Sequence, residues 1–144
     1  MIYIGIDPGD SGAFAYVADG DYATYPWDSE MFINALKVFK ESGCVACVEK
    51  VHSMPKQGVS STFKFGKNAG YIEGVLDTLR IPYQLVQPEK WKKEYSLGND
   101  KKNSVIACKR LFPDVDLKRT EKCRKDDDGM AEALLMAEYA RRHF

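Results

Sequence analysis

The sequence predicts an α/β fold in which helices flank a five-stranded mixed sheet. The chain has 144 residues, 44% of them hydrophobic, which suffices for one core and leaves no room for a second domain of ordinary size. Three apolar runs separated by turn residues come first, and helical patterns then alternate with two further runs. Because turns join antiparallel strands and helices join parallel ones, we expect three antiparallel strands followed by parallel strands, with residues 1–144 forming a single domain.

The first three strands are marked by apolar runs and by the turns between them. Ile2–Asp7 and Gly12–Ala18 flank a segment rich in proline, glycine and aspartate, and Tyr22–Trp27 follows the sequence Asp-Gly-Asp. These residue types favour tight turns. The spacing therefore predicts a three-stranded antiparallel meander.

A helix, a strand and a loop are predicted next. Apolar residues recur at helical spacing between Ser29, a plausible N-cap, and Gly43, which ends the pattern. The run Cys44–Val51 predicts a strand that returns parallel to the first one. The segment His52–Ser61 contains a proline, a glycine and three serines, which is typical of a mobile surface loop.

The next predicted helix, Thr62–Arg80, carries glycines four residues apart at Gly66, Gly70 and Gly74. Glycine is less stable than alanine inside a helix by about 0.8 to 1.0 kcal/mol, so we expect close packing to compensate. The missing side chains would let another backbone approach, either the sheet beneath or a second subunit. Charged residues interrupt the segment, which argues against pairing inside a membrane.

The remaining chain predicts a fifth strand, a basic connecting segment and two helices. The strand is Ile81–Val86, the basic segment starts at Pro88, and the helices lie near Asn103–Phe112 and through Met130–Arg142. The order is three strands, helix, strand, helix, strand, helix, helix. This order predicts a mixed sheet with helices on its faces.

The cysteines and the N-terminus indicate a reducing, intracellular setting. Cys44, Cys47, Cys108 and Cys123 are expected to be free thiols, because a domain of this size without an export signal needs no disulfides. Two cysteines three apart in a strand point to opposite faces, which favours core packing over a shared metal. No apolar segment approaches the roughly 20 residues that span a bilayer, and Met1 leads directly into a strand pattern. We therefore expect a soluble intracellular protein, cytoplasmic or nucleoid-associated.

The net charge is zero, but the charges are distributed unevenly. Residues 84–125 carry twelve basic and six acidic side chains, whereas residues 1–49 carry two and eight. A basic region between acidic ones suits a polyanion held against a metal site. A solvated basic loop and helix would explain the same pattern equally well.

Four acidic residues lie where the predicted fold would bring them to one edge of the sheet. Asp7 and Glu49 each end an apolar strand run, and Asp128 and Glu132 lie four apart at the start of the last helix, on one helical face. Neighbouring carboxylates raise each other's pKa unless a cation lies among them. The pattern predicts a divalent metal site, and a metal-dependent phosphodiester nuclease is the leading hypothesis.

Taken in order, these motifs resemble those of the ribonuclease H-like superfamily and, within it, the RuvC-like Holliday junction resolvases, especially the compact phage and organellar type. The similar segments extend along nearly the whole chain. They are the first acidic motif at 4–13, the second at 48–51 with 57–61, the helix at 63–70 that in the family lies at the dimer interface and faces DNA, the basic motif at 91–93 and 101–102, and the closing acidic helix at 125–135.

The resemblance implies a homodimeric crossover junction endodeoxyribonuclease that cuts a four-way DNA junction by paired symmetric nicks, each with a 5′ phosphate. Asp7 would bridge two Mg²⁺ ions, with Mn²⁺ expected to substitute, and Glu49, Asp128 and Glu132 would complete the coordination. The run of three aspartates leaves the frame ambiguous by one residue, so Asp127 is a credible substitute for Asp128. One or two of the three are expected to cap the helix instead.

Lysines of the basic motif would complete the catalytic site. By resemblance, Lys102 and Lys92 lie near the scissile phosphate, where a cation offsets charge developing in the transition state. Lys101 is the rival of Lys102, and Lys93 is the rival of Lys92. We assign the catalytic role to Lys102, while ordinary phosphate or solvent contact is the alternative for each.

Related resolvases carry an aromatic or apolar residue that intrudes at the junction crossover, and wedge side chains of this kind unstack bases. His52 or Met54 would be this wedge here, or else plain loop residues. Phe63 and Phe65 are further candidates, although at least one of them is expected to belong to the core. The residues expected to contact DNA are His52, Met54, Lys56, Lys64, Lys67, Lys92, Lys93 and Lys101.

Three other functions were compared with the resolvase hypothesis. A broader endonuclease acting on flaps or forks would share the fold and active site, so it stays open. A non-catalytic junction-binding protein is disfavoured by the complete acidic set. An actin-like or sugar-kinase-like phosphotransferase would need a second lobe that 144 residues cannot supply. We expect branched DNA as the partner, with neither a membrane nor a small-molecule substrate.

Overall fold

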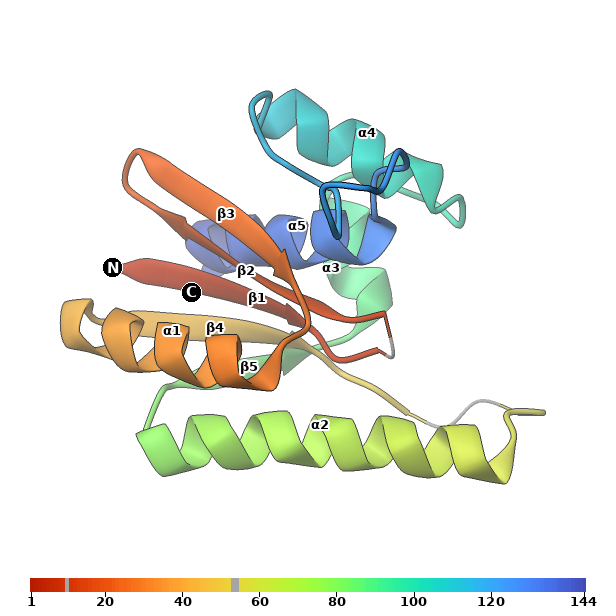
Figure 1. The fold of residues 1–144 in the computed structure, drawn as a ribbon, viewed down its shortest axis with the longest axis horizontal. Coiled ribbons are helices and arrows are strands. Elements are labelled where there is room, and N and C mark those ends of the chain that lie inside the picture. The colour runs from red at the N-terminus through yellow and green to blue at the C-terminus, as the bar shows by residue number, and fades with distance from the viewer. Residues whose placement is uncertain (10, 53–54) are drawn as a thin grey trace.

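A mixed sheet of five strands, in the order β3-β2-β1-β4-β5, forms the centre of the computed structural model, which describes residues 1–9, 11–52 and 55–144 (Figure 1). The strands are β1 Ile2–Asp7, β2 Ala13–Ala18, β3 Asp21–Pro26, β4 Cys44–Glu49 and β5 Tyr83–Val86. The first three form an antiparallel meander, and β4 and β5 continue the sheet in parallel with β1. The predicted mixed sheet is confirmed.

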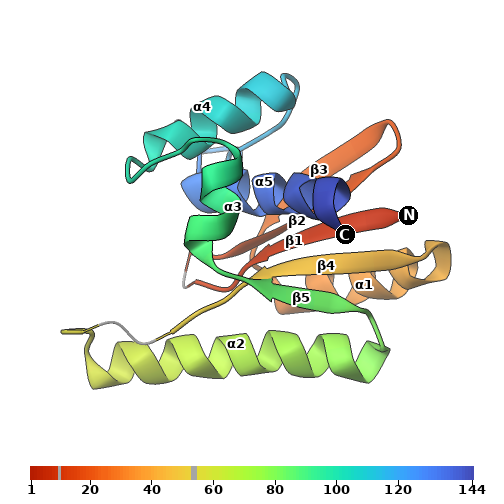
Figure 2. The same ribbon diagram turned by 180° about the vertical axis from the view of Figure 1, so that it is seen from behind.

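Helices cover both faces of this sheet. In the described part of the chain they are α1 Ser29–Ser42, α2 Val59–Leu79, α3 Pro88–Glu94, α4 Lys102–Leu111 and α5 Asp128–His143. α1 and α2 lie on one face, and α3, α4 and α5 lie on the other (Figure 2). Each face therefore has its own hydrophobic core. None of the described helices combines the length and apolar character needed to cross a bilayer.

The boundaries of the predicted elements agree with the structure to within about three residues: β4 ends at Glu49 and not at Val51, and β5 begins at Tyr83 and not at Ile81. The N-cap of α1 is Asp28, whose carboxylate accepts a hydrogen bond from the Met31 backbone N–H at 2.9 Å, and not Ser29. α2 begins at Val59, so the end of the predicted loop is helical. α3 was not predicted, although Pro88 at its first turn is well suited to start a helix.

The cysteines behave as predicted. Each of Cys44, Cys47, Cys108 and Cys123 is a free thiol. Cys44 belongs to the core beneath α1 and α2, whereas Cys47 belongs to the core beneath α5. The two side chains thus lie on opposite faces of β4 and cannot share a metal ion.

α5 crosses the centre of the sheet at very short range. A Cβ atom on Gly5, in the middle of β1, would overlap the backbone of Ala133 and Ala137. Only glycine permits this approach. The alanine-rich face of α5 is buried along most of its length as a result, which holds the first turn of α5 close to the end of β1.

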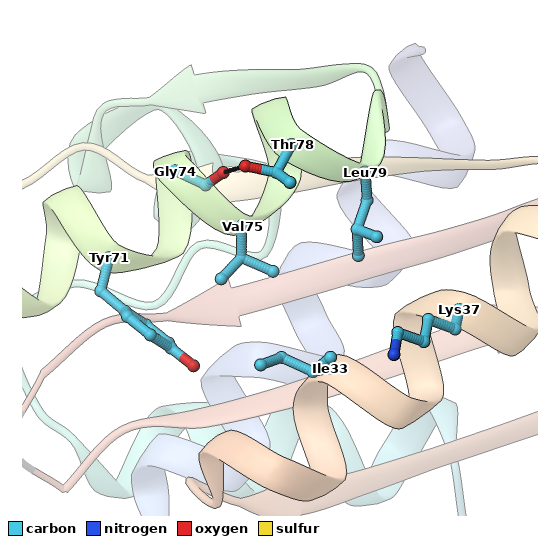
Figure 3. A pocket seen from close by; sticks show the side chains of 7 residues that line it. All are labelled: Ile33, Lys37, Tyr71, Gly74, Val75, Thr78 and Leu79. Carbon is cyan, nitrogen blue, oxygen red and sulfur yellow. Dashed lines mark hydrogen bonds between the residues drawn. The ribbon is translucent and has the colours of Figure 1, made fainter.

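The glycine stripe of α2 does not face the sheet. A Cβ atom on Gly66, Gly70 or Gly74 would meet no atom of the described residues within 4 Å, which excludes the sheet as the neighbour of this stripe. Gly74 borders an open groove of about 470 Å³ between α1 and α2. Figure 3 shows its lining residues, which are Ile33, Lys37, Tyr71, Gly74, Val75, Thr78 and Leu79.

Candidate active site

The candidate site lies at the edge of the sheet where β1 and β4 end. Asp7 is the last residue of β1, and Glu49 is the last residue of β4. These strands are parallel neighbours with Ile6 paired to Val48, so their carboxyl ends lie side by side. α5 begins at the same edge of the sheet (Figure 1).

The first turn of α5 reaches Asp7 because residue 129 is glycine. A Cβ atom on Gly129 would lie 2.5 Å from the Ser11 carbonyl oxygen and 3.5 Å from Asp7 Oδ2. The former distance is too short for any side chain, so the helix can approach the β1–β2 turn only with glycine here. This approach brings Asp128 and Glu132, four residues apart on one face of α5, to the end of β1.

The four predicted carboxylates form one electrostatic group, which we name the acidic cluster: Asp7, Glu49, Asp128 and Glu132. Burial raises the pKa of Asp7 from 3.8 to about 7, and repulsion from Glu49, Glu132 and Asp128 adds to this effect. The Gly9 backbone N–H donates to Asp7 Oδ1 at 3.2 Å and opposes the shift. Segments that are far apart in the sequence thus meet at one site.

The two glutamates of the cluster are held by uncharged donors. The indole Nε1–H of Trp91 donates to Glu49 Oε2 at 2.9 Å, and the Ser104 hydroxyl donates to Glu132 Oε1 at 3.2 Å. Burial raises the pKa of both glutamates, while the nearby Lys92 ammonium opposes this rise in each. Both side chains are therefore oriented by uncharged groups, and the described residues form no direct ion pair with either of them.

Two of the three consecutive aspartates have structural partners. Asp126 forms ion pairs with Lys109 and, at 2.7 Å, with Lys118. Asp127 is the N-cap of α5, because its Oδ2 accepts a hydrogen bond from the Met130 backbone N–H at 2.8 Å. These contacts connect α5 to α4 and to the loop before α5.

Asp128 is the aspartate of this run whose charge acts on Asp7. Its Oδ2 lies 3.7 Å from Lys101 Nζ, and its charge contributes to the raised pKa of Asp7 after burial, Glu49 and Glu132. Asp128 therefore belongs to the acidic cluster, whereas Asp127 caps α5. The predicted helical N-cap among these residues is Asp127.

Arg119 connects the two segments that carry Asp7 and Asp128. Its guanidinium donates to Asp127 Oδ1 at 2.8 Å, to the Gly12 carbonyl at 3.1 Å and to the Ser11 carbonyl. The β1–β2 turn and the N-cap of α5 are thereby joined through one side chain. Sequence reasoning missed this residue, because an arginine in a charged connector has no distinguishing pattern.

Other supporting residues were also missed. The hydrogen-bonding roles of Trp91 and Ser104 have no signal in the sequence. The close approaches at Gly5 and Gly129 could have been found, because glycine inside a strand or at the start of a helix often marks a neighbouring backbone.

The predicted DNA-contacting residues lie on two sides of the sheet edge. Exposed residues between β4 and α2 and on α2 are His52, Lys56, Lys64 and Lys67. On α3 and at the start of α4, Lys93, Lys101 and Lys102 are exposed and Lys92 is half-buried. Met54 lies outside the described residues. The acidic cluster is therefore flanked by lysines from both faces of the molecule.

Among the predicted lysines, Lys92 and Lys101 are the ones whose charges reach the acidic cluster in the described contacts. Lys102 begins α4, and its backbone N–H donates to Asp100 Oδ1 at 2.9 Å. The Lys102 side chain is exposed, and the residue before it, Lys101, makes the contact with Asp128.

The two phenylalanines at the start of α2 lie outside both cores, so the expectation that at least one is a core residue is wrong. Phe65 is half-buried and lies beside the β1–β2 turn, where a Cβ on Gly9 would be 3.7 Å from its ring. Phe63 is 70% exposed. The reason is that the first turns of α2 extend past the end of the sheet (Figure 1).

The donor chemistry of the acidic cluster fits Mg²⁺. Carboxylate oxygens are the ligands that this ion prefers, and the crowded charge that raises the pKa of Asp7 is what a divalent cation would compensate. Within residues 1–9, 11–52 and 55–144, no group of three or more His, Cys, Asp or Glu side chains is arranged to hold a metal ion. The cluster is thus a set of neighbouring charges and not a closed coordination cage.

β1 is the central strand of the sheet, ends in an aspartate and is crossed by α5, and solved RuvC structures share this fold. The chain is similar to RuvC of Thermus thermophilus in complex with a Holliday junction substrate, with 17% identity and a TM-score of 0.60 over 99% of this chain and 97% of that one. A second Thermus thermophilus RuvC structure has 16% identity and a TM-score of 0.57 over 99% and 96%. No family model and no curated protein matches the sequence. The resemblance to RuvC-like proteins is confirmed at the level of the fold.

Proposed function

We propose that this protein is a metal-dependent, structure-selective endodeoxyribonuclease that resolves four-way DNA junctions by paired symmetric nicks. The observation that carries the proposal is the acidic cluster, in which carboxylates from β1, β4 and α5 meet at one edge of a RuvC-like sheet. The similarity to a RuvC that is bound to a Holliday junction substrate supports the same class of substrate.

Asp7, Glu49, Asp128 and Glu132 would hold two Mg²⁺ ions, with Mn²⁺ as a substitute. When bound in such a site, paired divalent ions activate a water molecule and stabilise the departing 3′ oxygen of the phosphodiester. The contribution of the chain is to hold these carboxylates in place. Hydrogen bonds from α3 and α4 orient the two glutamates, and the Gly9 backbone N–H orients Asp7.

The flanking lysines would bind the phosphates of branched DNA across this edge of the sheet. Lys92 and Lys101 lie next to the acidic cluster, so they are well placed to offset charge at the scissile phosphate. Lys102 keeps its predicted catalytic role as a candidate that the approach of DNA could bring closer. Exposed lysines on α2 would position the neighbouring duplex arms.

The enzyme would act as a homodimer through α2. The open glycine stripe of α2 and the apolar groove beside it support this proposal (Figure 3). A second copy could approach closely along the stripe and cover Tyr71, which is 40% exposed in the groove. A dimer with two active sites could cut two strands of one junction and so produce the proposed paired nicks.

At the junction crossover, the wedge would come from the segment that leads into α2 or from the first turns of α2. His52 is exposed before this helix and Phe63 is 70% exposed on its first turns, while Met54 is outside the described residues. An apolar ring that projects beyond the sheet is suited to unstack a base pair. Loss of the 2-aminopurine fluorescence increase at the crossover in H52A or F63A would identify the wedge, and an unchanged signal in both would exclude these two residues.

The decisive experiment compares cleavage of synthetic four-way junctions, flaps, forks and linear duplexes in Mg²⁺, and then in Ca²⁺. Paired symmetric nicks in the junction alone would support a resolvase, whereas equal cutting of flaps and forks would favour the broader endonuclease. Asp7→Asn should bind the junction without cutting it. Binding without cutting by the wild-type protein in Mg²⁺ or Mn²⁺ would indicate a non-catalytic junction-binding protein.

A further inference from the structure

We propose that Trp91 is a positioning residue, which fixes the Glu49 carboxylate for metal binding through its indole N–H. The inference rests on the proposed function, because it assumes that Glu49 is a metal ligand. Its geometric basis is the hydrogen bond from Trp91 Nε1 to Glu49 Oε2, which measures 2.9 Å. The Trp91 side chain is completely buried.

Trp91 is held by a rigid part of the molecule. α3 starts directly after β5, and β5 is joined to the end of β4 by a hydrogen bond of 2.8 Å from the Lys50 N–H to the Val86 carbonyl. The indole ring belongs to the hydrophobic core that includes Leu97 and most of α5. The donor therefore stands in a fixed place beside the end of β4.

The chemistry of the indole suits a carboxylate that must keep its charge. A buried indole N–H needs an acceptor, and a hydrogen bond to a carboxylate is stronger than one between neutral groups. Glu49 has three rotatable side-chain bonds, and this contact restricts them. Unlike a lysine or arginine, tryptophan orients the carboxylate without supplying a positive charge, so the full negative charge of Glu49 stays available to a cation.

Lys92, which follows Trp91 in α3, contributes a positive charge and no hydrogen bond to Glu49 in the described contacts. Lys92 Nζ lies 5.6 Å from the centroid of the Trp91 ring, and its charge acts on both Glu49 and Glu132. Consecutive residues of α3 thus provide a neutral positioning group and a cation. Only the neutral group makes a hydrogen bond to Glu49 in the described contacts.

The test compares Trp91→Phe with the matched control Trp27→Phe. The chain has two tryptophans, and Trp27 packs against the core of the opposite face, beneath α1 and α2. Isothermal titration calorimetry with Mg²⁺ should show a Kd that is about 10- to 100-fold weaker in W91F, the range found when groups that orient metal ligands are removed. The Kd of W27F should equal that of the wild type.

The outcomes separate the two proposals. A folded W91F protein that binds Mg²⁺ like the wild type would overturn the positioning role of Trp91, even if its thermal stability were reduced. A wild-type protein that binds neither Mg²⁺ nor Mn²⁺ would instead overturn the metal site of the proposed function.

A second measurement avoids any folding defect of W91F. In the ¹⁵N-labelled wild-type protein, the two indole N–H resonances can be assigned with W27F. Addition of Mg²⁺ should shift the Trp91 indole resonance and leave that of Trp27 in place. An unchanged Trp91 resonance in a protein that calorimetry shows to be saturated with Mg²⁺ would contradict the inference.

Discussion

Replacing Asp7 with asparagine should stabilise the metal-free protein at alkaline pH. Burial, followed by repulsion from Glu49 and Glu132, raises the pKa of Asp7 from 3.8 to about 7. Each tenfold change in proton affinity corresponds to about 1.4 kcal/mol. The charged form of Asp7 is therefore destabilising in the metal-free fold by on the order of 4 kcal/mol, which is an upper limit for the effect.

The sign of the pH dependence follows from the direction of this shift. The folded state binds the Asp7 proton more tightly than the unfolded state, so the contribution to stability is complete below the ordinary pKa of 3.8 and is lost as the pH rises through about 7. Asparagine has no charge to bury, and its side-chain oxygen can still accept the Gly9 N–H hydrogen bond. As the pH rises from about 4 to about 7, the free energy of unfolding of D7N should therefore increase relative to that of the wild type.

The assay is urea unfolding of both proteins in EDTA at about pH 5 and about pH 8, with the free energy of unfolding obtained by linear extrapolation. Asp19→Asn is the control, because Asp19 is exposed in the β2–β3 turn. The advantage of D7N should grow with pH, and Mg²⁺ should restore stability to the wild type only. If D7N is no more stable than the wild type at about pH 8, the electrostatic description of the cluster is wrong.

Three further predictions concern the supporting residues. Asp128→Asn should keep the stability of the fold and lose Mg²⁺ binding in calorimetry, whereas Asp127→Ala should remove the N-cap of α5 and lower the free energy of unfolding by about 1 kcal/mol; the reverse pattern would assign the metal to Asp127. Arg119→Ala should lower the free energy of unfolding by about 2 kcal/mol and impair junction cleavage, because its charge-assisted bonds join the β1–β2 turn to α5; Arg119→Lys should recover part of both, and full activity of R119A would exclude a positioning role. Gly70→Leu should convert the proposed dimer into a monomer in sedimentation velocity, because the leucine side chain would separate two copies that pack along the glycine stripe. Helical circular dichroism should be preserved, because a side chain at residue 70 meets no described atom within one copy; an unchanged dimer would place the interface elsewhere.

Much of the fold could be predicted because its signals are local. The bounds of β1 were predicted to the residue, since the run Ile2–Asp7 is apolar and is followed by strong turn residues. The N-cap of α1 was predicted one residue too late, at Ser29 and not at Asp28. The two residue types have similar capping propensity, and only the hydrogen bond from the Met31 N–H distinguishes them. α3 was overlooked, because seven residues are too few for a helical period to stand out among lysines.

The sequence by itself determined all of the strands and every described helix except α3, their order, and that acidic side chains would end two strands and begin the last helix. These features depend on the spacing of apolar, turn-forming and charged residues along the chain, which can be read without coordinates. Only the tertiary structure placed the Asp128 charge beside Asp7 and the Asp127 carboxylate at the N-cap of α5, and gave Glu49 a hydrogen bond from Trp91, 42 residues away. Such pairings depend on how closely helices and strands approach one another in space, and a difference of one residue or a few ångströms there leaves no trace in the local pattern.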